Sequence, residues 1–215
     1  MKKTVLAITL GFSLISAGTF AQSKSEKNTK NENKSATAST SETKASGADS
    51  GNFMDKYFQI KESYKDLKDA YGAYASSNYG LEEFTKRYYS FKDAYPKLAR
   101  YSAQFAASEY TQPEFEKRFY QIKEVHPDMV TVHADYAASK WDLQEFVTRY
   151  HEIKAAYPKM KESFGSYASS NQKIDEFVKR YHAIKESYPK EKDLYPQYAA
   201  SVNPLEKGSL NVGSK

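Results

Sequence analysis

The sequence predicts an all-α protein, an α-solenoid of five helical hairpins of 31 residues each. Three observations support this prediction: an internal repeat without insertions, apolar residues at helical spacing, and proline at one fixed phase. The repeats are expected over residues 53–207, after a signal peptide and a disordered linker. Their bounds are 53–83, 84–114, 115–145, 146–176 and 177–207.

Residues 1–21 have the pattern of an export signal. Lys2 and Lys3 precede a mostly apolar run over 5–15, and residues 19–21 form a cleavage site with small residues at its first and third positions, Thr19 and Ala21. The run is too short to span a bilayer, and the chain has no cysteine for lipid attachment. We therefore expect a secreted or periplasmic protein that has no integral membrane segment after signal cleavage.

Residues 22–52 contain no aromatic or large aliphatic side chain. A segment of this composition buries too little surface to offset its chain entropy, so it is predicted to be a disordered linker. It would serve as a spacer, or as a tail that a partner orders. Residues 208–215 are expected to form a flexible tail.

The net charge of +5 lies mostly outside the predicted repeats. Residues 53–207 hold 24 Lys and Arg against 23 Asp and Glu, a net charge of +1. A nucleic-acid-binding domain concentrates positive charge in its folded part. The charge balance therefore argues against nucleic acid as a partner.

The repeat is visible in columns of identical residues 31 positions apart. We number positions from the phenylalanine that opens each repeat, which is position 0. The main columns are Phe53, Phe84, Phe115, Phe146 and Phe177 at position 0; Ala75, Ala106, Ala137, Ala168 and Ala199 at +22; Ser77, Ser108, Ser139, Ser170 and Ser201 at +24; and Pro96, Pro127, Pro158 and Pro189 at +12, where Lys65 stands in the first repeat.

Apolar residues at positions −3, 0, +4, +7 and +11 share one face of a first helix. Proline at +12 disfavours helical geometry in the residue before it, so this helix should end near Tyr95 in the second repeat. A second helix should run from there to about Ser108. Thr111 with Glu114, and Asp142 with Glu145, are candidate capping boxes for the next first helices. The phased prolines argue against a continuous coiled coil, the competing architecture.

The last repeat differs from the others in a way that suggests a solenoid end. Glu191 stands where other repeats have leucine or methionine, and Pro196 falls inside the second helix. Proline in a helix interior costs about 3 kcal/mol, so this helix is expected to be short or broken. A polar, interrupted terminal helix is what an exposed solenoid end requires.

The sequence offers little for catalysis, and we expect neither enzyme activity nor a cofactor nor a metal. It has no cysteine, and it lacks the serine-hydrolase, zinc-protease and phosphate-loop motifs. Its histidines mostly replace aromatic residues of other repeats, which indicates a packing role for residues such as His126 and His133.

A glutamate precedes an arginine by four residues in each of the last four repeats, as in Glu83 and Arg87. This is the favourable orientation for an ion pair within a helix. The arginine column is therefore expected to form a solvated face whose charges satisfy one another.

The lysine column at +8 has no acidic residue at helical pairing distance, and an aromatic or histidine residue precedes it by three positions. Together they form a candidate ligand-binding stripe, which we call the Lys/aromatic stripe: Phe58, Lys61, Tyr89, Lys92, Tyr120, Lys123, His151, Lys154, His182 and Lys185. Rings stack on sugars or on partner side chains, and ammonium groups bind anions. A purely structural interpretation competes, because lysine in the last turn favours the helix dipole and the rings would pack between repeats.

These observations favour a non-enzymatic exported binding or scaffold protein that engages a protein partner at or beyond the cell envelope. The alternative is binding of a glycan or an anionic polymer through the Lys/aromatic stripe, with affinity gained from multivalency. A secreted polymer of stacked repeats is also open.

Overall fold

A computed structural model describes residues 51–205, and the expected all-helical class is confirmed for them. The predicted signal peptide, nearly all of the predicted linker and the predicted tail lie outside the described residues. The long helices are α1 (Phe53–Ser63), α3 (Leu81–Ala94), α5 (Gln112–Val125), α7 (Leu143–Ala156) and α9 (Ile174–Ser187). The short helices are α2 (Tyr71–Ser76), α4 (Ser102–Ala107), α6 (His133–Ala138), α8 (Phe164–Ser169) and α10 (Tyr195–Ala200).

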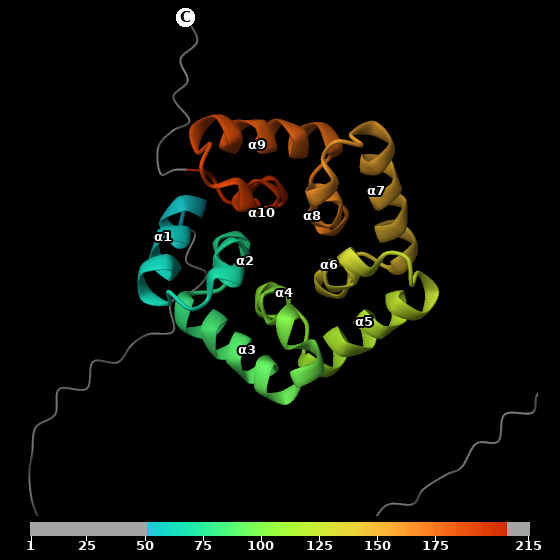
Figure 1. Cartoon of the computed structure of the whole chain (residues 1–215), viewed down its shortest axis with the longest axis horizontal. Helices are drawn as coiled ribbons and strands as arrows, with labels where there is room; N and C mark the ends of the chain where they lie inside the picture. The colour runs from blue at the N-terminus through green and yellow to red at the C-terminus, as the bar shows by residue number, and fades with distance from the viewer. Residues whose placement is uncertain (1–50, 206–215) are drawn as a thin grey trace, which may run out of the picture. The chain divides into compact units, whose positions relative to one another are not determined.

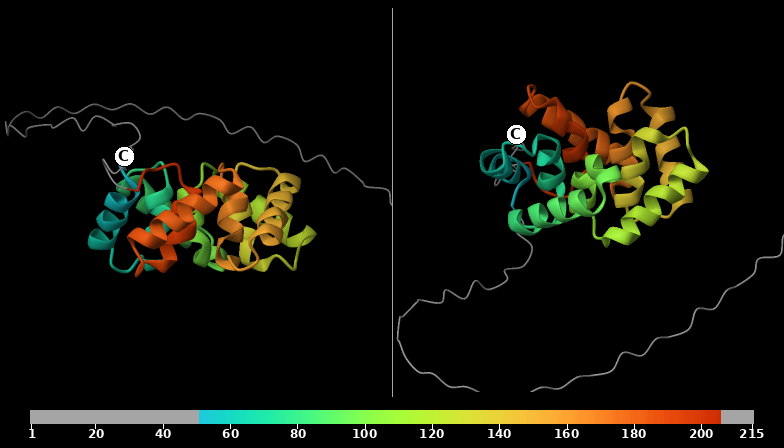
Figure 2. Two further views of the ribbon diagram at one scale, coloured as in Figure 1. Left: turned by 90° about the horizontal axis from the view of Figure 1, so that it is seen from above. Right: turned by 60° about the horizontal axis from the view of Figure 1, so that its bottom comes forward.

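The hairpins close into a ring, with the short helices inside and the long helices outside (Figures 1 and 2). Each long helix packs on the short helix that follows it, and each short helix packs on the short helices of both neighbouring repeats. The last short helix, α10, packs against α2 as well as α8. The open solenoid with two exposed ends, which the sequence suggested, is therefore wrong for this part of the chain.

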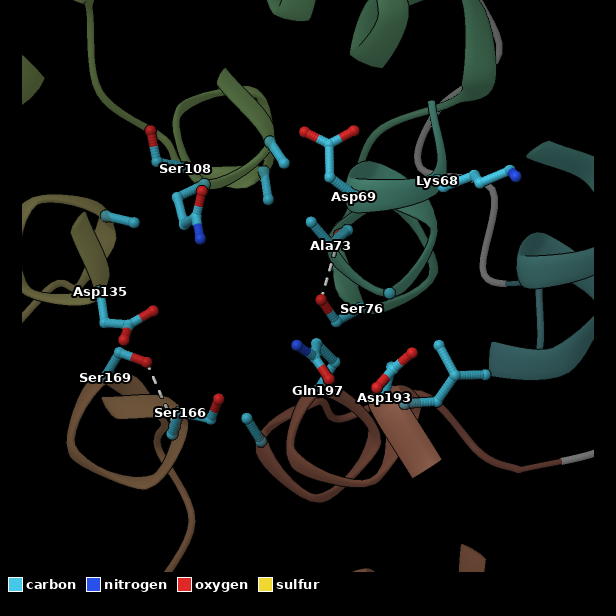
Figure 3. A pocket seen from close by; sticks show the side chains of 17 residues that line it. Lys68, Asp69, Ala73, Ser76, Ser108, Asp135, Ser166, Ser169, Asp193 and Gln197 are labelled. Carbon is cyan, nitrogen blue, oxygen red and sulfur yellow. Dashed lines mark hydrogen bonds between the residues drawn. The ribbon is translucent and has the colours of Figure 1, made fainter. Parts of the chain in front are cut away.

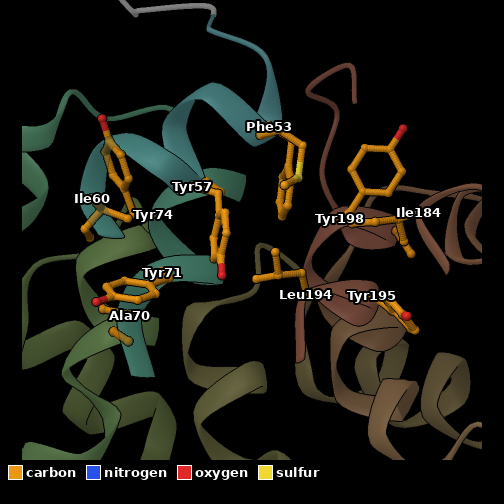
Figure 4. Packing of buried hydrophobic residues seen from close by; sticks show 14 of the residues in the cluster. Phe53, Tyr57, Ile60, Ala70, Tyr71, Tyr74, Ile184, Leu194, Tyr195 and Tyr198 are labelled. Carbon is orange, nitrogen blue, oxygen red and sulfur yellow. The ribbon is translucent and has the colours of Figure 1, made fainter. Parts of the chain in front are cut away.

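The core alternates large and small side chains. The phenylalanines at position 0 and the alanines at +22 are fully buried, and so are the aliphatic or aromatic residues at +7. Rings from neighbouring repeats pack edge-on, as Phe53 does against Tyr198 with centroids 5.2 Å apart (Figure 4). Large residues set against alanine reach native packing density and allow the inner helices to approach closely.

The second element of each hairpin is shorter than expected. The sequence suggested one helix from Pro96 to Ser108, but a 3₁₀ segment (Pro96–Tyr101) precedes α4. The same step occurs in the other repeats, at Lys68–Ala70, Val130–Val132, Lys161–Ser163 and Lys192–Leu194. A 3₁₀ turn tightens the chain after proline and sets the short α-helix at a new angle.

The expected helix ends are largely found. Tyr95 is the C-cap of α3, and Thr111 and Glu114 form a full capping box on α5. Asp142 accepts from the backbone N of Glu145 at 2.8 Å. Asn52, which the sequence analysis assigned to the linker, is buried and caps α1 by accepting from the backbone N of Asp55. An asparagine at this position is ordered because it satisfies a free helix donor.

Neighbouring repeats are joined by one recurring hydrogen bond. The side chain at +26 donates to the backbone carbonyl at +24 of the next repeat, at 2.8–2.9 Å. The donors are Tyr79, Tyr110, Trp141 and Gln172, and the acceptors are Ser108, Ser139, Ser170 and Ser201. In the last repeat Asn203 donates to the carbonyl of Ala75 at 2.8 Å, so a similar bond closes the ring.

Glu191 lies at the seam where the last repeat meets the first, not at an exposed end, and Pro196 is buried in the inner helix α10. The Tyr57 hydroxyl donates to Glu191 Oε2 at 3.0 Å, and Lys61 Nζ lies 3.9 Å from Glu191 Oε1. Pro196 is the second residue of α10, which is as long as the other inner helices. The expected break does not occur, because the first turn of a helix needs no backbone donor at that position.

Candidate functional site

The Lys/aromatic stripe lies on the outer helices, and its five lysines are exposed. Four of the ammonium groups rest over a ring of their own helix. Lys61 lies 5.0 Å from the Tyr57 ring and 5.9 Å from Phe58; the corresponding distances are 5.8 Å for Lys92 to Tyr88, 5.5 Å for Lys123 to Tyr120 and 5.6 Å for Lys154 to Tyr150. The structure therefore brings a lysine and a ring together in four of the five repeats, and the ring belongs to the stripe in two of them, at Phe58 and Tyr120.

The ring members of the stripe differ in exposure. Phe58 and Tyr120 are each 42% exposed, and His151 and His182 are exposed too. Tyr89 is half-buried and its hydroxyl donates to Asp66 Oδ2 of the preceding repeat at 3.2 Å. In every repeat the ring meets its sequence neighbour at +4 edge-on. Four of the five stripe rings thus leave much of their surface to solvent.

Acidic residues accompany the lysines of the stripe. The residue that follows the lysine is Glu62, Asp93, Glu124 or Glu186, and only Ala155 in the fourth repeat is uncharged. All of these side chains are exposed. The surface around the stripe therefore carries nearly balanced charge.

The arginine column has a different role from the one expected. Arg87 donates to four backbone carbonyls at the end of α4 and beyond it, with the shortest distance 2.7 Å to Ser108. Its guanidinium also lies 4.7 Å from the Tyr79 and Phe105 rings. The equivalent arginines cap the other inner helices in the same way, and no ion pair joins them to the preceding glutamates in the described residues.

Capping by arginine is favoured over the ion pair with glutamate because the last carbonyls of a helix have no partner in the helix. An exposed ion pair adds little to the free energy of unfolding. In the first repeat Lys56 does the same work, donating to the carbonyls of Ser77 and Tyr79 at 2.7 and 2.9 Å. The sequence held one clue to this. The first repeat keeps a basic residue, Lys56, at the position of the arginine column, although the residue four positions before it is Asn52 and not glutamate. A basic residue with no glutamate at that spacing indicates that the column has another partner.

A cavity of about 400 Å³ lies among the inner helices, and all five of them contribute to its wall (Figure 3). Sequence reasoning missed this cavity. Position +20 of each repeat faces it, and this column is Ala73, Gln104, Asp135, Ser166 and Gln197. The variation of position +20, within a repeat that is otherwise regular, was the feature of the sequence that could have indicated the cavity.

Asp135 is the most unusual group in this cavity. It has no hydrogen-bond or ion-pair partner among the described residues, and burial raises its pKa to about 7. Its carboxylate lies against the next inner helix, because a Cβ placed on Gly165 would fall 1.9 Å from Asp135 Oδ2. Gln197 lies against Gly72 in the same way, with the corresponding distance 3.0 Å to Gln197 Cγ.

Two further acceptors of the cavity wall are unsatisfied. The Oε1 atoms of Gln104 and Gln197 are buried without a hydrogen-bond partner. The hydroxyls of Ser76 and Ser169 donate back to carbonyls of their own helices at 3.0 and 3.1 Å. The amide nitrogens of the same two glutamines also lack a hydrogen-bond partner among the described residues, so the cavity wall offers donors as well as acceptors.

The histidines do not assemble a metal site in the described part of the chain, where no group of three metal-ligating side chains occurs. His133 is buried, its Nε2 is 3.0 Å from the carbonyl oxygen of His126, and it packs edge-on against Phe119. This is the packing role that the sequence indicated for it. Within residues 51–205, no helix is long and apolar enough to cross a membrane.

The fold and its surfaces define a class of protein, a closed ring of five helical hairpins with an outer stripe and a polar central cavity. Comparison of the chain with protein-family models, with curated proteins and with solved structures gave no match in any of the three.

Proposed function

We propose that the protein is an exported, non-enzymatic binding protein whose ring presents the Lys/aromatic stripe to a protein partner at or beyond the cell envelope. The observation that carries the proposal is the repetition of an exposed lysine, three residues after an aromatic or histidine residue, on each of the five outer helices; four of the five rings are exposed too. Outside the seam, the lysine and aromatic side chains of the stripe make few contacts that stabilise the closed ring of helices. A closed ring holds them at fixed positions, which lowers the entropy lost on binding.

The charge around the stripe favours a protein partner over a polyanion. An acidic residue follows the lysine in four of the five repeats, so a polyanion would meet repulsion along with attraction. A protein surface offers both charges and apolar side chains. Rings flanked by balanced charge suit such a surface, since aromatic residues dominate the energetics of protein interfaces.

The second candidate is a glycan, and the exposure of Phe58 and Tyr120 favours it. Sugars stack on exposed rings, and a polymer with a regular repeat would contact several copies of the stripe at once. In this case the rings would matter more than the lysines.

A capture experiment with the mature chain tests the proposal against both protein extracts and a glycan array. The test variant replaces Lys92, Lys123 and Lys154 by glutamine. The matched control replaces Lys86, Lys117 and Lys179, which are exposed at position +2 of the outer helices, and loses the same charge. We expect a captured protein to be lost with the test variant and retained with the control.

Two outcomes would redirect the proposal. Equal capture by wild type and both variants would remove the stripe lysines from the binding site. A glycan hit that survives lysine replacement but is lost in the Phe58→Ala and Tyr120→Ala double variant would establish the second candidate.

A further inference from the structure

We infer that the central cavity binds a linear organic cation with primary ammonium groups, of the diamine and polyamine class. The inference does not depend on the proposed function, because the cavity and the stripe share no residue. It rests on the carboxylate of Asp135, which has no partner within residues 51–205, on the position of the other two carboxylates and on the alanine walls of the cavity.

The cavity offers carboxylates with few cations to balance them. Asp69, Asp135 and Asp193 line it, and Lys68 is the one basic residue among its described lining residues. In Figure 3 the Lys68 side chain points away from the centre, whereas Asp135 and Gln197 point into it. Asp69 and Asp193 are exposed, and Asp69 accepts from the Tyr88 hydroxyl at 3.3 Å. Asp135 is half-buried and has no partner among the described residues, so a bound cation would offset the free-energy cost of its partial desolvation.

The fold holds Asp135 in place for such a ligand. Its carboxylate rests on Gly165 of the next helix, where any side chain would displace it. A primary ammonium group carries a positive charge and three donors, so it can bond to both oxygens of this carboxylate.

The carboxylates lie at two levels along the ring axis. Asp69 and Asp193 are at position +16, and Asp135 is at +20. Position +16 lies in the 3₁₀ segment and position +20 in the α-helix that follows it, so four residues separate the two levels by at most roughly 8 Å. A short methylene chain with an ammonium group at each end spans a distance of this kind, so one diamine would reach both levels.

The rest of the wall suits methylene groups. Five alanines, together with Gly72, form most of its apolar part; they are Ala73, Ala103, Ala107, Ala138 and Ala200. Small side chains leave space for a thin chain and give it apolar contacts. A wider or anionic ligand would meet either the walls or the carboxylates.

A ligand has a route into the cavity. A second cavity of about 280 Å³ is lined by the turns that join the repeats, and it shares Ser76, Ala107, Ser108, Ala138, Ser169 and Ala200 with the central one. The shared residues place the two cavities end to end. The face with the inter-repeat turns is thus the expected entrance.

Calorimetric titration and thermal unfolding of the full mature chain, in a cacodylate buffer free of amines and phosphate, test the inference. The probes are 1,4-diaminobutane, spermidine, butylamine and calcium chloride. We expect both polyvalent amines to bind and to raise the melting temperature, with butylamine weaker by about tenfold or more since it has one ammonium group.

The variant Asp135→Asn keeps the shape of the side chain and removes its charge, and it should weaken diamine binding by about tenfold or more. Asp128→Asn is the matched control, because Asp128 is exposed in a hairpin turn; it should bind as wild type does. A second variant, Ser169→Leu, narrows the cavity and leaves every carboxylate in place, so it should also lose binding. It keeps the test valid if Asp135→Asn fails to fold.

Three results would overturn the inference. The first is no binding of either polyvalent amine to the wild type. The second is equal binding to wild type, Asp135→Asn and Ser169→Leu, which would place the amine elsewhere. The third is stabilisation by calcium alone, which would make the cavity a metal site.

Discussion

The seam between the last and first repeats and the interface between the third and fourth repeats share one geometry but use different residues. In both, a side chain at position +20 leans on a glycine of the next inner helix: Gln197 on Gly72 at the seam, and Asp135 on Gly165 inside the chain. A neutral amide stands at one site and an acid at the other. Ring closure therefore depends on shape at this position, whereas the acid is free to serve another purpose.

The largest expected effect comes from filling the two glycine sites. A Cβ on Gly165 would fall 1.9 Å from Asp135 Oδ2 and 2.9 Å from Val132 Cγ1, while one on Gly72 would lie 3.0 Å from the flexible Gln197 Cγ. Overpacking costs about 1–3 kcal/mol, and alanine regains up to about 1 kcal/mol of helix propensity. We expect Gly165→Ala to lower the free energy of unfolding by about 2 kcal/mol and Gly72→Ala to change it little.

Urea unfolding followed by circular dichroism measures both values. The two variants add the same methyl group to the same repeat position, so each controls for the other. Equal losses would mean that the two interfaces do not differ in tightness, and a gain in Gly165→Ala would mean that Asp135 is free to move away.

The acid at the internal interface should make stability depend on pH, which the amide at the seam cannot do. Burial raises the pKa of Asp135 from 3.8 to about 7. Between these values the folded chain holds a proton that the unfolded chain has lost, so the unfolding free energy falls as pH rises and the loss is complete above the folded pKa. From pH 5 to pH 8 this contribution is on the order of 2 kcal/mol.

Asp135→Asn removes the titrating group and makes the internal interface resemble the seam. In amine-free buffer it should therefore gain stability relative to wild type by more at pH 8 than at pH 5. Unfolding of both proteins by urea at the two pH values gives the comparison. The same difference at both values would show that the carboxylate is ionised and well solvated in the folded ring.

The sequence predicted the hairpins well because their determinants are local. Spacing of three and four places Phe84, Tyr88 and Phe91 on one face, and Pro96 ends the helix one residue before it. Closure of the ring is not local. It depends on how closely the inner helices of neighbouring repeats approach, and the glycines at two of these contacts, Gly72 and Gly165, do not form a regular column.

The candidate sites divide along the same line. The outer stripe was found from its period, since its lysines and rings recur on exposed helix faces. The arginine caps and the central cavity were missed, because each depends on what lies opposite in space. Arg87 reaches carbonyls some twenty residues further on, at Phe105 and Ala106, and Asp135 has meaning only once five helices surround it.

The smallest expected effect concerns Glu191, a polar residue at a position where the other four repeats have leucine or methionine. Its equivalents Leu67, Leu98, Met129 and Met160 are buried, whereas the Glu191 side chain is 31% exposed and contacts the Tyr57 hydroxyl and Lys61. Exposed ion pairs contribute up to about 1 kcal/mol, so Glu191→Leu should change stability by less than that.

The effect of Glu191→Leu should instead appear in assembly. Polar groups at a terminal interface discourage pairing between chains, and an apolar residue there would let the last repeat of one chain accept the first repeat of another. We expect a small dimeric fraction by light scattering after size exclusion, which the control Met160→Leu lacks. A loss of more than about 2 kcal/mol in the free energy of unfolding, without any dimer, would instead mean that Glu191 holds the ring closed. If Glu191 served only to prevent pairing with other chains, its replacement by leucine would leave the monomer nearly as stable as the wild type.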